Sequence, residues 1–192
     1  MKKKNLFNLC IFGVGYVGLP LSLEFSKKYK VIAYDKDEKR ISSLRFGKDS
    51  NGDLEPRERR YLKKNKNLVF TSKINDIKNC NVYIITVPTP ISKKKEPDLR
   101  NIIDATKKVA TFIKKKDLVI YESTVFPGTT ENICVPIIEK KKNFKLNKDF
   151  IVGYSPERLS PGDNNHGLKK VIKVTSGSNL RASNIVNKLY KS

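Results

Sequence analysis

The chain has 192 residues, 38% of them hydrophobic, and its 40 basic residues exceed its 19 acidic residues to give a formal net charge of +21. This length suits one domain with a sizeable core, and the apolar content excludes a wholly disordered chain. No apolar run approaches the roughly 18 residues of a membrane-spanning helix, and the basic, glycine-interrupted start carries no evident export signal, so we expect a cytoplasmic location.

Short apolar runs alternate with helical patterns along the chain. The apolar runs predict strands at 9–12, 31–34, 68–70, 82–85, 118–121, 150–152 and 171–174. The spacing of apolar residues predicts helices over 17–28, 37–45, 55–64, 99–113, 129–139 and 180–190. Most of the strands are apolar on both faces, as strands of a parallel sheet covered by helices must be. The alternation therefore predicts an α/β fold, with a Rossmann-like, doubly wound, mostly parallel sheet and helices on both faces.

Three glycines follow the first predicted strand and open the first predicted helix. The segment consists of Gly13, Val14, Gly15, Tyr16, Val17 and Gly18, which is the G-x-G-x-x-G pattern of a dinucleotide-binding turn. In such a turn Gly13 permits the tight bend, Gly15 lets the backbone approach a pyrophosphate, and Gly18 lets the helix pack close to the strand. The amino end of the helix adds N–H donors and partial positive charge. These six residues are therefore predicted to bind a dinucleotide.

Asp35 ends the second predicted strand, 22 residues after Gly13. An acid near this distance accepts hydrogen bonds from the adenosine ribose and repels a 2′-phosphate, which favours NAD over NADP. Arg40 lies close behind, and its positive charge would weaken that exclusion unless it belongs to a solvated helix face. The predicted cofactor is NAD.

Two hydroxyl-rich loops follow the fourth and fifth predicted strands. Residues 86–90 are Thr-Val-Pro-Thr-Pro, whose prolines stiffen the loop and hold Thr89 in place. Residues 122–130 carry Thr124 among several hydroxyls and one acid. Either loop alone is equally well explained as ordinary turn chemistry. Because the carboxyl ends of parallel strands meet at one edge of the sheet, the two loops together favour a site.

Residues 154–163, after the sixth predicted strand, place an acid beside a base. Glu157 is a candidate general base or water-orienting group, and Arg158 is a candidate for holding an anionic or polyhydroxyl substrate. A surface ion pair on a proline-rich turn is the alternative. His166, the single histidine, has no carboxylate or nucleophile at an informative spacing, and we expect it to be an exposed loop residue.

The cysteines and the basic charge suggest no further site. Cys10, Cys80 and Cys134 lie far apart, unlike a disulfide framework or a zinc cluster, so we expect buried thiols and no metal site. Of the 40 basic residues, 32 are lysines scattered in short clusters at expected loops and helix ends, whereas arginine is scarce. A general bias toward lysine and asparagine is therefore favoured over dedicated nucleic-acid binding.

Four segments in order, residues 11–20, 86–90, 121–128 and 154–163, resemble the UDP-glucose/GDP-mannose dehydrogenase family. The resemblance extends over nearly all 192 residues. The last two segments are most similar to the branch that acts on UDP-N-acetylhexosamines. That branch includes the UDP-N-acetylglucosamine and UDP-N-acetylgalactosamine 6-dehydrogenases of Vi-antigen, capsule and O-antigen synthesis.

This resemblance implies an NAD-dependent oxidoreductase that converts carbon 6 of a UDP-sugar from alcohol to carboxylate in two steps, with two NAD⁺ per sugar. Carried over by position, it implies NAD contacts of Tyr16, Val17, Asp35, Arg40, Thr89 and Thr124. It also implies that Thr124 and Glu157 position water, and that Glu157, Arg158 and Leu159 contact the UDP-sugar. In the family a cysteine captures the aldehyde, and water hydrolyses the thioester that the second oxidation forms.

The family's catalytic cysteine, with its lysine and asparagine, lies beyond the NAD-binding domain, and no cysteine here fits its glycine-rich motif. We therefore expect residues 1–192 to form the NAD-binding Rossmann domain, without the family's central helix and C-terminal UDP-binding domain. The expected partners are a UDP-N-acetylhexosamine and a chain or domain that supplies the cysteine. A non-catalytic NAD-binding module and a truncated remnant without turnover are the alternatives.

Overall fold

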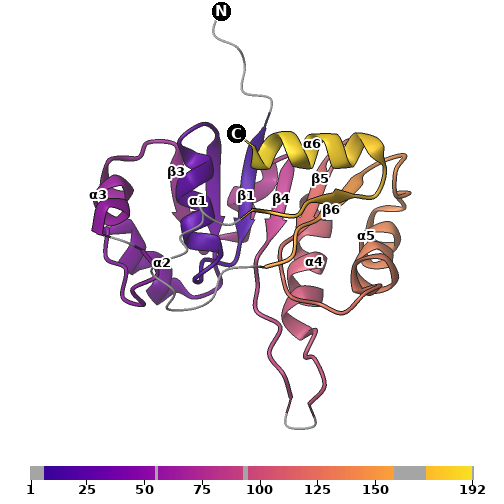
Figure 1. Cartoon of the computed structure of the whole chain (residues 1–192), viewed down its shortest axis with the longest axis horizontal. Helices are drawn as coiled ribbons and strands as arrows, with labels where there is room; N and C mark the ends of the chain where they lie inside the picture. The colour runs from indigo at the N-terminus through magenta and orange to yellow at the C-terminus, as the bar shows by residue number, and fades with distance from the viewer. Residues whose placement is uncertain (1–6, 55, 93–94, 158–171, 192) are drawn as a thin grey trace, which may run out of the picture.

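A computed structural model describes residues 7–54, 56–92, 95–157 and 172–191 of the chain. Seven strands form one sheet in the order β3-β2-β1-β4-β5-β6-β7 (Figure 1). They are β1 (Asn8–Phe12), β2 (Lys30–Tyr34), β3 (Leu68–Thr71), β4 (Val82–Ile85), β5 (Leu118–Tyr121), β6 (Ile151–Tyr154) and β7 (Ser176–Gly177). The first six run parallel, and β7 pairs antiparallel with β6. The strand order reverses between β1 and β4, which makes the sheet doubly wound.

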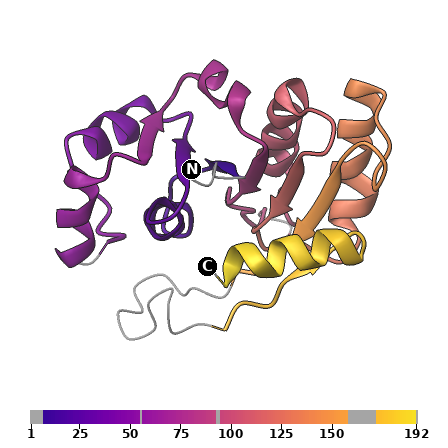
Figure 2. The same cartoon turned by 90° about the horizontal axis from the view of Figure 1, so that it is seen from above.

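Helices cover both faces of this sheet, as Figure 2 shows for α6 and α5 on opposite sides. In the described part they are α1 (Gly18–Ser26), α2 (Glu38–Arg45), α3 (Pro56–Lys64), α4 (Arg100–Phe112), α5 (Val135–Lys142) and α6 (Leu180–Tyr190), with the 3₁₀-helix η1 (Ile74–Asn79) and the π-helix η2 (Thr130–Cys134). None of these helices is both long enough and apolar enough to span a lipid bilayer.

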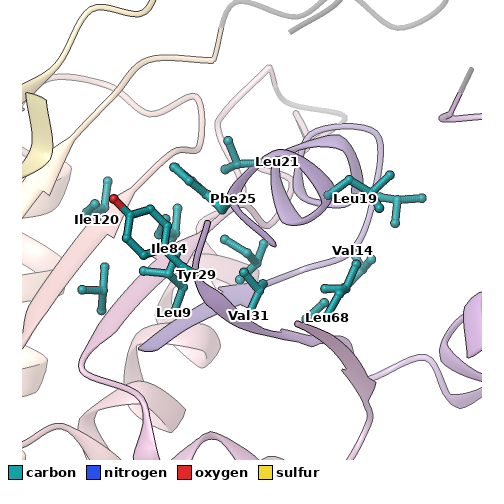
Figure 3. Packing of buried hydrophobic residues seen from close by; sticks show 14 of the residues in the cluster. Leu9, Val14, Leu19, Leu21, Phe25, Tyr29, Val31, Leu68, Ile84 and Ile120 are labelled. Carbon is teal, nitrogen blue, oxygen red and sulfur yellow. The ribbon is translucent and has the colours of Figure 1, made fainter. Parts of the chain in front are cut away.

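Side chains alternate along β1 between two packed layers. Leu9 and Ile11 join the cluster formed with α1 and α6, whereas Cys10 and Phe12 join the cluster formed with α4 and α5. Figure 3 shows part of the first cluster, in which Phe25 of α1 packs over the strands. Because helices cover both faces, the six parallel strands are mostly apolar, and the predicted Rossmann-like fold is confirmed.

The predicted strand at residues 171–174 is wrong. Val171 lies outside the described residues, and residues 172–175 have no regular structure, while a two-residue strand follows at Ser176 and Gly177. The apolar side chains of Ile172 and Val174 are 83% and 53% exposed, so they do not contribute to the core on which the prediction depended. The sheet instead ends with a short antiparallel strand.

The predicted helix at residues 129–139 exists but has two parts. A π-helix runs from Thr130 to Cys134, and α5 continues to Lys142. Pro136 has no N–H to donate to the carbonyl of Asn132, four residues earlier, so the regular α-helical bonding is interrupted there. In the π-helix the N–H of Val135 donates to the carbonyl oxygen of Thr130, five residues earlier.

Candidate cofactor site

The carboxyl ends of the parallel strands border a cleft of about 660 Å³. This volume lies within the range of small-molecule sites, and the cleft opens where the strand order reverses, as ligand sites of doubly wound sheets do. The predicted site residues that line it are Gly13, Val14, Gly15, Tyr16, Val17, Asp35, Arg40, Thr89, Thr124 and Glu157. Gly18 lies at the start of α1, beneath the turn. Arg158, Leu159 and His166 lie outside the described residues.

The turn between β1 and α1 requires glycine at two of its three glycine positions. Gly13 has a φ of +103°, a conformation that side chains rarely adopt. A Cβ on Gly18 would lie 1.9 Å from the carbonyl oxygen of Gly13 and 2.6 Å from Oγ1 of Thr86. Glycine at these positions therefore allows the turn to form and α1 to pack against the sheet.

Gly15 differs, because a Cβ built on it meets no protein atom within 4 Å. Its open side faces the cleft that Gly15 itself lines, so the backbone is accessible to a ligand there. The first turn of α1 carries no acidic residue that would oppose an anion. The turn is thus shaped and charged to receive a pyrophosphate, and the residues present fit a dinucleotide.

The Asp35 carboxylate points toward this turn. Its Oδ2 accepts a hydrogen bond from the N–H of Val14 at 2.8 Å, and its Oδ1 accepts one from the N–H of Asp37 at 3.0 Å. Two backbone donors therefore fix the carboxylate at the edge of the cleft. Each oxygen keeps a further lone pair with which to accept a ribose hydroxyl.

Arg40 does not lie on a solvated helix face, and two carboxylates compensate its charge. The guanidinium is almost fully buried and forms ion pairs with Asp49 at 2.8 Å and Asp53 at 2.6 Å. Its Nε also donates to the carbonyl oxygen of Val14 at 3.3 Å. The alternative of a solvated helix face is therefore wrong for Arg40, and two carboxylates compensate its charge, while its effect on NAD selectivity stays a prediction.

The two hydroxyl-rich loops meet in the cleft. The Thr89 hydroxyl donates a hydrogen bond to the carbonyl oxygen of Thr124, which joins the loop after β4 to the loop after β5. The Ser123 hydroxyl donates to the carbonyl oxygen of Val87 at 2.7 Å, so a second bond joins the same loops. In addition, Nδ2 of Asn101 in α4 donates to the carbonyl oxygen of Pro88 at 3.0 Å. These bonds hold both predicted threonines at one wall of the cleft.

A buried carboxylate lies behind this wall. Glu122 is 1% exposed, forms an ion pair with Lys173, and accepts a hydrogen bond from the Tyr190 hydroxyl at 2.5 Å. Burial raises the pKa of Glu122, while the nearby Lys173 charge opposes that rise. This cluster ties the end of β5 to α6 and to the segment before β7. Lys173 and Tyr190 were not predicted from the sequence, because they follow Glu122 by 51 and 68 residues and belong to no motif.

Glu157 lines the same cleft as the glycine-rich turn. The pKa of the Tyr16 hydroxyl is raised, first by burial and then by the negative charge of Glu157. The charge of Glu157 also contributes to raising the pKa of Glu122. An acid therefore lines the cleft together with the cofactor turn and Thr124, and its role in positioning water stays a prediction.

The three cysteines are all remote from this chemistry. Cys10 and Cys134 are fully buried and Cys80 is 2% exposed. Burial raises the pKa values of the Cys10 and Cys134 thiols, which disfavours the nucleophilic thiolate. None of them lines the cleft.

The glycine-rich turn, the acid at the end of β2 and their place at the reversal of strand order define a dinucleotide-binding domain of the dehydrogenase type. Comparison with known families identifies the kind of dehydrogenase. Residues 7–192 match the NAD-binding domain of the UDP-glucose/GDP-mannose dehydrogenase family. The chain belongs to this family, as its motifs indicated, and its cofactor is NAD.

Relatives that are similar to this chain include two UDP-N-acetyl-D-glucosamine 6-dehydrogenases. The protein from Salmonella typhi is 48% identical over 186 residues, and the protein from Pseudomonas aeruginosa is 46% identical over 183 residues. Each alignment covers 95% of this chain but only 42–43% of the relative. Protein CapL of Staphylococcus aureus is 42% identical, with 96% of this chain and 43% of CapL covered. The chain thus spans less than half the length of these relatives.

Solved structures show the same architecture. A UDP-D-ManNAc dehydrogenase from Pyrococcus horikoshii superimposes with a TM-score of 0.87 at 33% identity, covering 96% of this chain and 44% of that one. A GDP-mannose dehydrogenase from Pseudomonas aeruginosa superimposes with a TM-score of 0.86 at 26% identity and the same coverage. The fold is therefore preserved well beyond the relatives of high sequence identity.

Proposed function

We propose that this chain is the NAD-binding part of a UDP-N-acetylhexosamine 6-dehydrogenase, which oxidises carbon 6 of the sugar to a carboxylate for surface polysaccharide synthesis. In this proposal residues 1–192 form one NAD-binding domain, and the catalytic cysteine and the UDP-binding domain come from elsewhere. The cytoplasmic location stays a prediction.

The observation that carries the proposal is the meeting of four sequence motifs at one cleft. The glycine-rich turn, the loop of Thr89, the loop of Thr124 and the segment of Glu157 all line it. The identity of 46–48% to two UDP-N-acetyl-D-glucosamine 6-dehydrogenases favours an N-acetylated sugar as substrate.

Different residues of the chain bind the cofactor and position the water. NAD, when bound, supplies the hydride acceptor. The turn at Gly15 and the amino end of α1 hold the pyrophosphate, and Asp35 holds the adenosine ribose. The Thr124 hydroxyl and the Glu157 carboxylate, which also line the cleft, orient the water that hydrolyses the thioester. The buried cluster around Glu122 fixes the loop that carries Thr124.

Because all three cysteines are buried, we expect the catalytic cysteine to come from another chain or domain. Without that nucleophile the chain binds the cofactor but cannot complete the oxidation. A non-catalytic NAD-binding module is the second candidate function, and the same burial favours it.

Calorimetric titration with NADH tests the cofactor assignment. The purified chain should bind NADH, and Asp35→Ala should weaken binding about tenfold, because hydrogen bonds from the ribose to a charged acceptor are lost. Glu24→Gln, which removes a carboxylate from the surface of α1, is the control and should leave the affinity unchanged. A folded chain without measurable NADH binding would contradict the proposal.

Turnover separates the two candidate functions. The chain alone should not reduce NAD⁺ in the presence of UDP-N-acetylglucosamine. Co-expression with the remaining C-terminal part of the Salmonella typhi relative should restore NADH production if the chain is a dehydrogenase component. NADH binding without restored turnover would instead support the non-catalytic module. Steady NADH production by the chain alone would show that a nucleophile is present within it.

A further inference from the structure

Arg40 reaches the cleft beside the residue that is assigned to the ribose. Its Nε donates to the carbonyl oxygen of Val14, and the N–H of the same Val14 donates to Asp35. The guanidinium and the Asp35 carboxylate therefore flank one residue of the glycine-rich turn. Both side chains line the cleft, so Arg40 borders the same space as the acid that is assigned to the ribose.

The guanidinium is held by two acids from the segment after α2. Its Nη1 donates to Asp49 at 2.8 Å, and its Nη2 donates to Asp53 at 2.6 Å. The side chain of Asp49 is fully buried and that of Asp53 is 12% exposed. The second oxygen of Asp49 accepts a hydrogen bond from the N–H of Leu54 at 2.8 Å, which fixes the segment in place. All three guanidinium nitrogens thus have a partner.

The charged groups that contact Val14 and the Arg40 guanidinium are acidic. Two carboxylates face one guanidinium, and Asp35 adds a third negative charge on the other side of Val14. Arginine recognises phosphate through its forked N–H donors, and here these donors are directed at carboxylates in a site shielded from water. Ion pairs in such sites are screened much less than exposed pairs.

We propose that Asp49 and Asp53 are positioning residues that sequester Arg40 and thereby set the preference for NAD over NADP. Removal of Asp35 alone would then be insufficient to admit NADP, because Arg40 would still be paired with Asp49 and Asp53. The proposal rests on the adenosine of NAD lying beside Asp35.

Two exposed lysines offer a competing explanation. Lys36 and Lys39 also line the cleft, and either could meet a 2′-phosphate from the solvent side. Among the described residues, Asp49 and Asp53 form their ion pairs with Arg40 and not with these lysines. Variants that separate Arg40 from these lysines therefore decide between the two explanations.

The test compares dissociation constants for NADH and NADPH, measured by fluorescence titration of the full chain. Asp35→Ser should improve NADPH affinity only slightly. Asp35→Ser with Asp53→Ala should bind NADPH about tenfold more tightly than Asp35→Ser alone, since a released guanidinium forms charge-assisted bonds with the phosphate. Adding Arg40→Ala should abolish this gain, whereas adding Lys36→Ala and Lys39→Ala should preserve it.

Controls make each outcome decisive. Glu38→Gln replaces Asp53→Ala as the matched control, because it removes an exposed carboxylate from the same helix as Arg40 without releasing the guanidinium. Asp53→Asn keeps the size of the side chain while removing its charge, and it serves if alanine unfolds the segment. A gain that Glu38→Gln reproduces, a gain that depends on the lysines, or no gain in folded variants overturns the proposal. Failure of the unaltered chain to bind NADH would instead remove the proposed function itself.

Discussion

At the scale of single residues, Gly15 and Gly18 illustrate two different requirements for glycine within one motif. The position of Gly18 has no space for a methyl group, since the nearest backbone oxygen would be 1.9 Å away. The position of Gly15 has space, but that space belongs to the cleft. We therefore expect Gly18 to be required for stability and Gly15 to be required for cofactor binding, and mutation can separate the two requirements.

Gly18→Ala should lower the free energy of unfolding by at least about 2 kcal/mol, because the helix must move away from the sheet. Gly15→Ala should change it by less than about 0.5 kcal/mol and yet weaken NADH binding about tenfold, because the methyl group occupies the approach of the pyrophosphate. Urea denaturation and NADH titration of both variants measure the two effects. Equal losses of stability would contradict this division of roles.

At the scale of secondary-structure elements, lysine side chains donate hydrogen bonds to carbonyl oxygens at the carboxyl ends of helices. Nζ of Lys142, at the end of α5, donates to the carbonyl oxygen of Thr111 in the last turn of α4 at 2.8 Å. Nζ of Lys114 donates to the carbonyl oxygen of Lys78 in η1 at 2.7 Å. Cations at these ends satisfy open carbonyls and complement the helix dipole. Part of the basic charge thus has a local structural role.

The turn between α4 and β5 also contains an acid with a displaced pKa. Asp117 is 5% exposed, and its Oδ2 accepts a hydrogen bond from the N–H of Lys114 at 2.8 Å. Burial raises its pKa to about 6, although the hydrogen bond and the charge of Lys114 act in the opposite direction. At Asp117 the folded chain therefore binds more protons than the unfolded chain between about pH 4 and pH 6.

This difference makes the free energy of unfolding fall as the pH rises from 4 to 6. Asp117→Asn keeps an acceptor for the N–H of Lys114 but cannot ionise, so its stability relative to the unaltered chain should rise by about 1–3 kcal/mol over that interval. Denaturation at several pH values measures it. Asp149→Asn is the control, because the pKa of Asp149 is lowered by hydrogen bonds from Lys145 and Lys115, and its effect should appear below pH 4. A constant difference for Asp117→Asn between pH 4 and 6 would contradict the assignment.

At the scale of the whole molecule, an open cleft at the carboxyl ends of the strands is separate from the closed core on the two faces of the sheet. All three cysteines lie in the core, with exposed fractions of 0–2%, whereas Thr124 is exposed at the cleft. Thiol chemistry therefore reports on this separation. It also tests whether the chain has a nucleophile of its own.

In the native chain no thiol should react with a water-soluble disulfide reagent in the time that an exposed thiol needs, because access is blocked and the thiolates of Cys10 and Cys134 are disfavoured. All three should react in guanidinium chloride. Thr124→Cys should add one reactive thiol that NADH protects. Rapid reaction of a native cysteine would contradict the core described here.

The pattern of apolar residues was sufficient to predict six strands and the main helices, because most residues of these strands are buried. It failed at residues 171–174, where the apolar side chains described face the solvent rather than a core. It also gave no sign of the π-helix before Pro136, since the missing backbone bond matters only once the helix has formed. Local patterns predict an element only where the same residues are later buried as the pattern assumes.

By itself, the sequence predicted the doubly wound class, the family and the use of NAD, because strand–helix alternation, the four motifs and the spacing from Gly13 to Asp35 can be read along the chain. Only the tertiary structure decided that Arg40 is neutralised by Asp49 and Asp53, and that Glu122 is paired with Lys173 and Tyr190. The physical reason is that a charge acquires its partners and its dielectric surroundings from folding. No spacing along the chain specifies them.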